Sequence, residues 1–238
     1  MTVTDVNVVK SAIFERPDDA NKGTLGSLLC VCGSYGMAGA AVMSAKGALR
    51  TGIGLAKCAL PRSIYPIVAQ TILESVYYPL SENADGRISK VNVPFLVSES
   101  CKSSATLVGC GLGVCDDTLK IVFSFIENST TPLVLDADAL NCVAKQPEIL
   151  LRKKAPIIIT PHPGEMSRLT GLATPLVNAE RERVALDFAQ KYGVVTVLKG
   201  AGTVIASPNG KVLVNPTGNS GMATGGSGDV LAGMTASI

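Results

Sequence analysis

The chain has no tryptophan, a single histidine and few charged or aromatic residues. Charged residues make up 17% and aromatic residues 4% of its 238 residues, whereas hydrophobic residues make up 47%. A chain of this length and composition can bury a large core, which excludes a disordered protein, a disulfide miniprotein and a fibrous repeat. The 21 Lys and Arg residues nearly balance the 19 Asp and Glu residues, so neither a nucleic acid nor a membrane is implied as a partner.

Signals for a zinc site, a membrane span and a secretory leader are missing as well. The seven cysteines are odd in number and include no C-x-x-C pair, and a zinc-ligand spacing is absent. We therefore expect no dedicated metal ligands, and we expect buried, reduced thiols in a cytoplasmic protein. No apolar run approaches the ~18 residues that a membrane span needs, and residues 1–7 show no charged-then-apolar signal pattern.

Apolar, β-rich runs alternate with helical stretches, which predicts a layered α/β fold. The length favours one domain over residues 1–238. The pattern predicts helices over 37–50 and 178–192, the second with Gly193 as its C-terminal cap. The expected strands are 27–32, 53–59, 105–108, 132–135, 156–159 and 194–198. Residues 203–206 and 211–214 flank Asn209 and Gly210, which predicts a hairpin.

Five of the expected strands end in glycine, aspartate, histidine or lysine. The carboxyl ends of parallel strands share one rim of a sheet, and ligands bind at that rim. The sequence therefore predicts a binding site at this rim, where the strand ends would be brought together. The five loops concerned are 33–36, 109–113, 136–138, 160–165 and 199–203.

The most informative motif spans residues 223–233, where a glycine-rich turn leads into Asp229 and a run of small residues. Backbone N–H groups of Gly226, Ser227 and Gly228 can converge there at a positive helix N-terminus, which forms an anion hole. An acid beside an anion hole fits a base that takes a proton from an alcohol while the amides hold a phosphoryl group in transfer. Asp229 as a plain helix N-cap is an equally good alternative for the motif by itself.

Two common nucleotide-binding motifs are absent from the chain. It has no G-x-x-x-x-G-K-[ST] sequence, which excludes a P-loop enzyme, and no G-x-G-x-x-G, which disfavours a dinucleotide-binding dehydrogenase. The remaining interpretation is a phosphoryl-transfer site that uses a glycine turn and an aspartate.

Nearly the whole chain resembles, in order, the ribokinase-like ADP- or ATP-dependent NAD(P)H-hydrate dehydratases. The segments that carry the resemblance are 33–41, 45–52, 135–141, 160–165, 199–203 and 219–229. It implies a three-layer α/β/α sandwich with a central, mostly parallel sheet. It also implies a lyase that repairs the S epimer of hydrated NADH or NADPH. A nucleotide phosphorylates the C6 hydroxyl of the hydrate, and phosphate then leaves. Mg²⁺ and a homotetramer are implied as well.

The resemblance also implies roles for particular residues, and each has an alternative. Asp229 is the implied base and a substrate contact, and Gly226, Ser227 and Gly228 are the implied anion hole. Ala40, Gly113 and His162 are the other implied substrate contacts; close helix packing is the alternative for Ala40, and a satisfied polar residue is the alternative for His162. The implied nucleotide contacts are Lys199, Gly200, Ala201, Gly202, Thr203 and Gly228.

A strand-to-hairpin turn with a solvated lysine is the alternative for the segment 199–203. Asp136, Asp138 and Asn141 are expected near the phosphates, with helix capping as their alternative. Cys110 stands where the family usually has a proline. The family normally continues with further helical segments beyond this point, so we expect the C-terminus at Ile238 to be incomplete.

Two other functions remain open at this stage. One is a kinase for a vitamin alcohol in the same superfamily, and the other is a non-catalytic module that senses a nucleotide. The sequence does not decide between ADP and ATP, or between NADH and NADPH.

Overall fold

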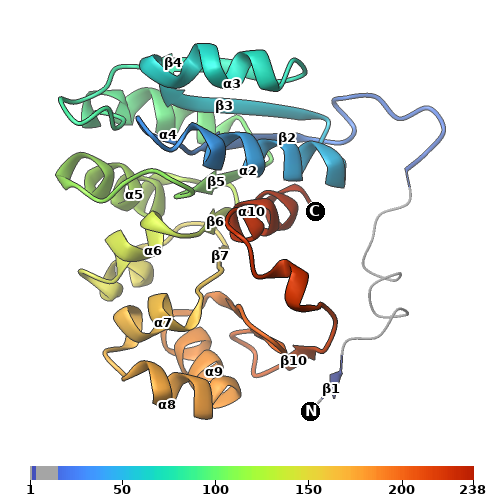
Figure 1. The fold of residues 1–238 in the computed structure, drawn as a ribbon, viewed down its shortest axis with the longest axis vertical. Coiled ribbons are helices and arrows are strands. Elements are labelled where there is room, and N and C mark those ends of the chain that lie inside the picture. The colour runs from blue at the N-terminus through green and yellow to red at the C-terminus, as the bar shows by residue number, and fades with distance from the viewer. Residues whose placement is uncertain (1, 4–15) are drawn as a thin grey trace.

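The computed structural model describes residues 2–3 and 16–238, and within them the strands form one ten-stranded sheet. Figure 1 shows the strands stacked along the long axis of the molecule, from β4 at the top to β10 near the bottom. In chain order the strands are β1 (Thr2–Val3), β2 (Ser27–Val31), β3 (Leu55–Pro61), β4 (Val76–Leu80), β5 (Ala105–Val108), β6 (Leu133–Leu135), β7 (Ile157–Ile159), β8 (Val195–Leu198), β9 (Thr203–Ala206) and β10 (Val212–Asn215).

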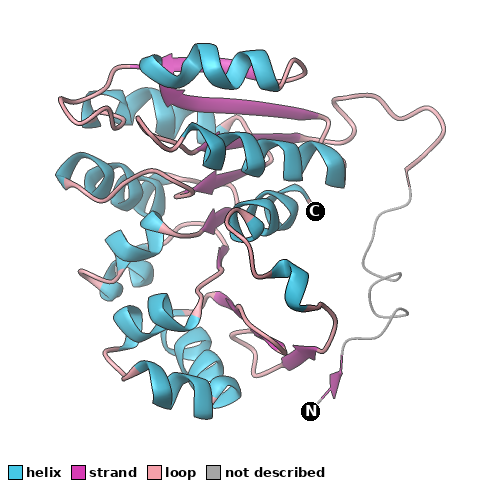
Figure 2. Cartoon of the chain, in the orientation of Figure 1, coloured by secondary structure: helices cyan, strands magenta, loops and turns pink. Residues whose placement is uncertain are grey.

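The helices lie on both faces of this sheet (Figure 2). They are α2 (Ala38–Thr51), α3 (Tyr65–Thr71), α4 (Val93–Cys101), α5 (Asp116–Asn128), α6 (Asp138–Val143), α7 (Pro163–Thr170), α8 (Thr174–Ala179), α9 (Arg181–Tyr192) and α10 (Ser227–Ser237). Short 3₁₀ turns are η1 (Arg62–Ile64), η2 (Lys90–Asn92), η3 (Pro147–Arg152) and η4 (Ser220–Met222). None of the helices in the described part of the chain is long and apolar enough to cross a membrane.

The seven consecutive strands from β8 to the edge strand β4 are parallel, and their order reverses beside β2. The chain passes from β2 to β3 and β4 on one side, and then returns to the other side of β2 with β5. From β5 it continues outward through β6, β7 and β8, and β9 adds to β8 in the antiparallel direction. The loops that follow β2 and β5 therefore diverge at a switch point, where open α/β sheets bind ligands.

The two faces of the sheet carry different cores. Along β2, Leu28 and Cys30 belong to one buried cluster, while Leu29 and Val31 belong to the other, as the alternation of a strand requires. The first cluster contains the alanines of α2 and α10, and the second contains larger side chains such as Phe125 of α5. This arrangement confirms the expected three-layer α/β/α sandwich with a mostly parallel sheet.

Helices α2 and α10 pack side by side on one face of the sheet (Figure 1). Two glycines permit this contact. A Cβ atom at Gly47 would lie 2.6 Å from the carbonyl oxygen of Val230, and one at Gly233 would collide with the carbonyl oxygen of Ser44. The close packing fixes the position of α10 and brings its N-terminus to the carboxyl rim of the sheet.

Most expected elements are confirmed, and two needed correction. The strand expected over 53–59 is Leu55–Pro61, because the N–H of Gly54 still belongs to a turn that bonds to Leu25. The helix expected over 178–192 is wrong as a single helix, since the backbone breaks at Glu180 (φ −127°, ψ 41°) between α8 and α9. The Asn209–Gly210 hairpin and the left-handed cap at Gly193 (φ 63°) are confirmed.

Candidate active site

The five loops predicted to share a rim do meet there, and bonds between neighbouring loops join them. The N–H of Gly33 donates to the carbonyl of Cys110 (2.8 Å), and the Cys110 thiol donates to Asp136 (3.7 Å). The Thr160 hydroxyl donates to Asp136 (2.7 Å), and the N–H of Lys199 donates to Pro161 (2.8 Å). The ends of β2, β5, β6, β7 and β8 therefore form one continuous polar surface.

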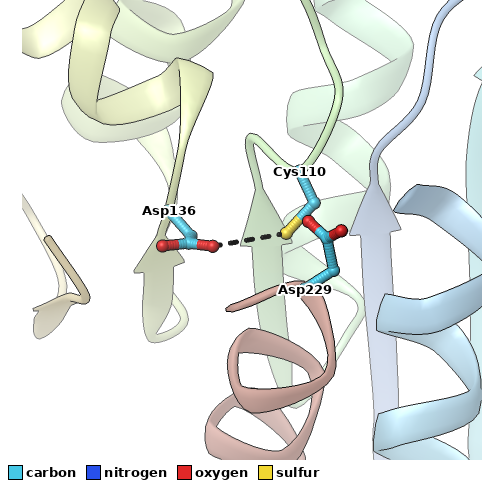
Figure 3. A group of neighbouring side chains, drawn as sticks. All are labelled: Cys110, Asp136 and Asp229. Atoms are coloured by element: carbon cyan, nitrogen blue, oxygen red, sulfur yellow. Dashed lines mark hydrogen bonds between the residues drawn. The ribbon is translucent and has the colours of Figure 1, made fainter. Parts of the chain in front are cut away.

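Helix α10 brings Asp229 to the middle of this surface (Figure 3). Reactive atoms of Cys110, Asp136 and Asp229 all lie within 4.8 Å of one another. The N-cap of α10 is Gly226, whose φ of 91° requires glycine, and Asp229 is the third residue of the helix. The alternative in which Asp229 is the N-cap is therefore wrong.

The N-terminus of α10 offers backbone donors beside that carboxylate. The first amides of a helix have no acceptor within the helix, and the helix dipole makes this end positive. Gly226, Ser227 and Gly228 provide the N-cap and the first two of these positions, and the N–H of Ser227 makes a long bond to the carbonyl of Thr224 (3.4 Å). A Cβ atom at Gly226 would collide with Met43 of α2. The structure thus places the predicted anion hole and the predicted base on the same turn of backbone.

The surroundings of Asp229 favour its protonated form. Burial raises the pKa of its carboxyl group, and the nearby charges of Asp136 and Asp138 add to this shift. A hydrogen bond from Cys110 and the charge of Lys199 oppose it. The ionised form of a carboxyl group with a raised pKa is a stronger base than the carboxylate of an ordinary aspartate.

Lys199 is paired and largely buried, so the alternative of a solvated lysine is wrong. Its Nζ atom lies 2.6 Å from Oδ1 of Asp136 and 3.7 Å from Oε2 of Glu165, and its side chain is 17% exposed. A Cβ atom placed on Gly228 would be 3.6 Å from the same Nζ. The ammonium group therefore lies between two carboxylates and the start of α10, next to the anion hole.

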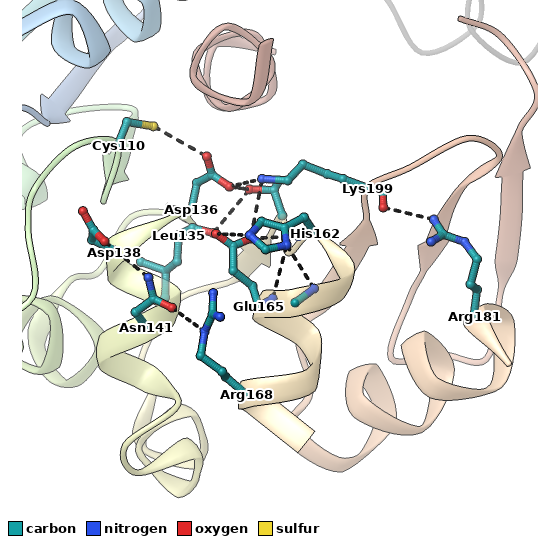
Figure 4. Close-up of polar contacts among 12 residues, drawn as sticks. Cys110, Leu135, Asp136, Asp138, Asn141, His162, Glu165, Arg168, Arg181 and Lys199 are labelled. Atoms are coloured by element: carbon teal, nitrogen blue, oxygen red, sulfur yellow. Dashed lines mark hydrogen bonds and ion pairs between the residues drawn. The ribbon is translucent and has the colours of Figure 1, made fainter. Parts of the chain in front are cut away.

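His162 and Glu165 form a reciprocal cap at the start of α7 (Figure 4). The N–H of His162 donates to Glu165 (2.7 Å), while Nδ1 of the imidazole accepts from the N–H of Gly164 (3.0 Å). Because Nδ1 accepts, a neutral ring carries its proton on Nε2. Burial, assisted by the charges of Lys199 and Arg168, lowers the pKa of His162 and favours that neutral ring.

Glu165 lies in the first turn of α7, where the helix dipole favours an acid, and its contacts exceed that role. Burial raises the pKa of its carboxyl group from 4.5 to about 7, against the opposing charge of Lys199 and the His162 N–H. Its carboxylate lies 3.5 Å from Nε2 of His162. The His-x-x-Glu spacing at residues 162–165 is the sequence signal for this cap.

Asp138 holds the loop that contains Gly113. It accepts from the N–H of Gly113 (2.8 Å) and from the Asn141 amide (3.3 Å), and Asn141 in turn accepts from Arg168 (2.8 Å). Sequence analysis did not single out Arg168. Asp136 and Asp138, which follow the end of β6, therefore both accept hydrogen bonds from the protein and face the same rim.

The other two expected substrate contacts, Ala40 and Gly113, are packed tightly against neighbouring residues. Ala40 is 4% exposed, and a Cβ atom at Gly111 would be 2.7 Å from its side chain, so Ala40 does provide close packing. Gly113 has φ 75°, and a Cβ atom there would meet Arg87 at 2.5 Å. The sequence did not identify Arg87 as a site residue, because the residues on either side of it in the chain form no motif.

A cavity of about 500 Å³ adjoins the predicted nucleotide segment. It is lined by residues 178–183 together with Ala201, Gly202, Val204 and Val214. Of the other predicted nucleotide contacts, Lys199 points to Asp136, and the Thr203 hydroxyl donates to the carbonyl of Gly200 (2.9 Å). The structure therefore divides the segment between this cavity and the polar rim.

Cys110, Asp136 and Asp229 do not make a fitting magnesium site. Mg²⁺ prefers oxygen ligands in octahedral geometry, and a thiol is a soft ligand. Both carboxylate oxygens of Asp136 also already accept hydrogen bonds, one of them from the ammonium of Lys199. These residues would not hold the ion by themselves.

Comparison with known proteins gives consistent matches. A family described as NAD(P)H-hydrate dehydratase matches residues 28–238. A bifunctional NAD(P)H-hydrate repair enzyme, Nnr, of Thermofilum pendens is 41% identical over 223 residues, which cover 94% of this chain and 43% of that protein. The ADP-dependent (S)-NAD(P)H-hydrate dehydratase of Neisseria meningitidis is 34% identical over 226 residues, which cover 94% of this chain and 72% of that protein. This chain thus spans less than half the length of the bifunctional relative.

A solved structure agrees with these relatives. The ADP/ATP-dependent NAD(P)H-hydrate dehydratase of Bacillus subtilis, co-crystallised with ATP and Mg²⁺, superposes with a TM-score of 0.83. It is 31% identical in sequence, and the match covers 99% of this chain and 80% of that one.

Proposed function

This chain belongs to the NAD(P)H-hydrate dehydratase family, and we propose that it restores NADH and NADPH from the S epimers of their hydrates at the expense of ADP or ATP. The observation that carries the proposal is the position of Asp229, a half-buried carboxylate on the same helical turn as the amides of Gly226, Ser227 and Gly228. A base and an anion hole that adjoin are what phosphoryl transfer to an alcohol requires.

In the first step, Asp229 takes the proton of the C6 hydroxyl, and the hydroxyl oxygen bonds to the terminal phosphorus of the nucleotide. The bond from phosphorus to the nucleotide's bridging oxygen breaks, and the amides at the start of α10 hold the phosphoryl group as it moves. In the second step, the C6–O bond breaks and phosphate leaves with the electron pair. Loss of a proton from C5 then restores the ring double bond.

Lys199 supplies a positive charge for this transfer. Its ammonium group lies beside Gly228 and is held by Asp136, so its position is fixed before any ligand arrives. A preorganised charge stabilises the phosphoryl group without rearrangement at the moment of reaction. Magnesium would supply further charge neutralisation, and because the carboxylates and thiol do not form a cage for it, the ion would arrive on the nucleotide's phosphates.

The remaining substrate contacts belong to the same proposal. Ala40, Gly113 and His162 contact the hydrated nicotinamide, with the Nε2–H of His162 as a hydrogen-bond donor. The nucleotide lies along Lys199–Thr203 and Gly228, partly in the cavity beside Ala201 and Gly202. Residues 1–238 act as one ribokinase-like domain.

A cytoplasmic location and a homotetrameric assembly complete the proposal. The seven cysteines, all within residues 16–238, form no disulfide, which supports a reducing compartment. The resemblance to the family supports the tetramer.

The decisive experiment incubates the protein with the S epimer of hydrated NADH or NADPH, Mg²⁺, and either ADP or ATP. We expect the absorbance band of the reduced nicotinamide to return. We expect Asp229→Asn to lower the rate by roughly 10² to 10⁴-fold, because a positioned base contributes about that much, while nucleotide binding persists. Asp187→Asn, which changes a carboxylate with 60% exposure, is the matched control and should keep the wild-type rate.

Other results would point to the other functions. A stable phosphorylated product without recovery of absorbance indicates a kinase, and nucleotide binding without any turnover indicates a sensing module. Wild-type turnover by Asp229→Asn would contradict the proposed role of this carboxylate.

A further inference from the structure

The two glycines of the turn after β8 have different surroundings. Gly200 has φ 145°, and a Cβ atom there would lie 3.0 Å from both terminal nitrogens of Arg181. Gly202 has φ 67°, and the nearest atom to a Cβ there would be Cγ1 of Val214, at 3.8 Å. Gly200 thus makes room for a guanidinium group, whereas Gly202 faces the cavity that it lines.

Arg181 holds this turn by its backbone. Its Nη2 atom donates to the carbonyl of Leu198 (2.8 Å) and to that of Lys199 (3.2 Å). Figure 4 shows the contact with Lys199. Arg181 is the first residue of α9, immediately after the break at Glu180. The break therefore coincides with the residue that ties α9 to the end of β8.

The charge of Arg181 is not compensated by a carboxylate. Within residues 16–238, no Asp or Glu oxygen lies within 4.0 Å of its guanidinium group, and its Nε atom is buried with no hydrogen-bond partner. Its neighbour Arg183 differs, because it pairs with Glu180 and Asp187. A partly buried cation without a carboxylate partner attracts an anion that approaches it.

We propose that Arg181 is a positioning residue for the nucleotide. It fixes the carbonyls of Leu198 and Lys199, so that Ala201 and Gly202 present their backbone to the cavity, and its charge favours phosphate groups at that wall. The identity of the ligand as a nucleotide rests on the proposed function. The positioning itself rests on the contacts of Arg181 and on the cavity that it lines.

The test compares Arg181→Gln and Arg181→Lys with wild type by calorimetric titration of ADP and ATP, together with steady-state kinetics. We expect Arg181→Gln to raise the nucleotide Kd and KM by about 10- to 100-fold, the range for a lost charged hydrogen bond, with the KM for the hydrate unchanged. Arg181→Lys should recover part of the affinity, because it keeps the charge but cannot bridge both carbonyls. Arg152→Gln is the matched control, since the side chain of Arg152 is 65% exposed and pairs with Glu127.

The results distinguish the role inferred for Arg181 from the proposed function of the protein. If Arg181→Gln melts at a lower temperature but binds nucleotide as wild type does, Arg181 has a structural role only and the inference is wrong. If that variant does not fold, the Kd of Arg181→Lys decides in the same way. A wild-type protein that binds nucleotide without repairing the hydrate overturns the proposed function. In that case the ratio of the nucleotide Kd of Arg181→Gln to that of wild type still tests the role of Arg181. A wild-type protein that binds neither ADP nor ATP overturns both.

Discussion

At the scale of single residues, Glu165 shows how burial and charge compete within the site. Its carboxyl group caps His162 and lies 3.7 Å from the ammonium of Lys199, which favours the ionised form. Burial has the larger effect and raises its pKa from 4.5 to about 7. Glu165 therefore takes up its proton near neutral pH, so its titration can be measured as a probe of the rim.

The folded protein holds a proton on Glu165 at pH values where the unfolded chain has lost it. The stabilisation from this proton is complete below pH 4.5 and disappears as the pH rises through about 7. We expect the difference in unfolding free energy between wild type and Glu165→Gln to favour wild type more at pH 5 than at pH 8, by about 1 to 3 kcal/mol. Denaturant unfolding at both pH values measures this, and glutamine can still cap His162.

Glu127→Gln is the control for that measurement, because Glu127 lies in a surface pair with Arg152. Equal differences at pH 5 and pH 8 for Glu165→Gln would show that the carboxyl group titrates at its ordinary pKa.

The residues that the sequence predicted and those that it did not differ in one physical respect. Asp229 and Gly226 lie in a local motif, where glycine, an acid and a helix start are adjacent in the chain. Arg181 and Arg87 act on segments distant in the chain, and their own neighbours carry no signal. The pairing of Lys199 with Asp136 joins β8 to β6 and likewise depends on the register of the sheet.

At the scale of elements, the contact between α2 and α10 sets the position of Asp229. Gly47 and Gly233 allow backbone to meet backbone across this contact. The run of small residues in both helices was visible in the sequence, but which of them face one another depends on how the helices cross. Strand ends were easier to predict, since the apolar run of β5 stops where Gly109 begins a turn (φ 130°).

Gly233→Ala tests this contact. Its new Cβ would collide with the carbonyl of Ser44, so we expect α10 to shift, with a loss of about 1 to 3 kcal/mol in unfolding free energy and a fall in the rate that depends on Asp229. Gly39→Ala in α2 is the matched control, because a Cβ there meets nothing within 4 Å and should stabilise the helix slightly. Equal stability of the two variants in thermal or denaturant unfolding would contradict the tight packing.

At the scale of the whole molecule, the candidate site lies across the middle of the sheet and the cavity beside the predicted nucleotide segment lies toward one end. The rim loops join β2 to β8, while the cavity is bounded by α9, β9 and β10. A nucleotide that bridges them would contact segments from both parts of the fold.

Alternation of strands and helices predicted the layered architecture, but strand order could not be read from the sequence, because it depends on long-range pairing.

We therefore expect a nucleotide to stabilise the entire fold against heat. At a concentration of 100 times its Kd, a ligand that binds only the folded state adds about 2.7 kcal/mol. For a chain of this size, that corresponds to a rise in Tm of about 5 to 11 °C. Differential scanning calorimetry with ADP and ATP measures it, with inorganic phosphate as the comparison, and an unchanged Tm at saturation would contradict binding to the folded state.

The late place of α10 in the chain has a consequence for how the molecule matures. Asp136, Thr160 and Lys199 can meet as soon as β6, β7 and β8 have paired, yet Asp229 reaches them only when the chain doubles back from β10 across the sheet to α2. During synthesis, the segments that form the sheet are therefore complete before Asp229 is added to the chain. Turnover reports the docking of α10, whereas circular dichroism reports the formation of helices and strands.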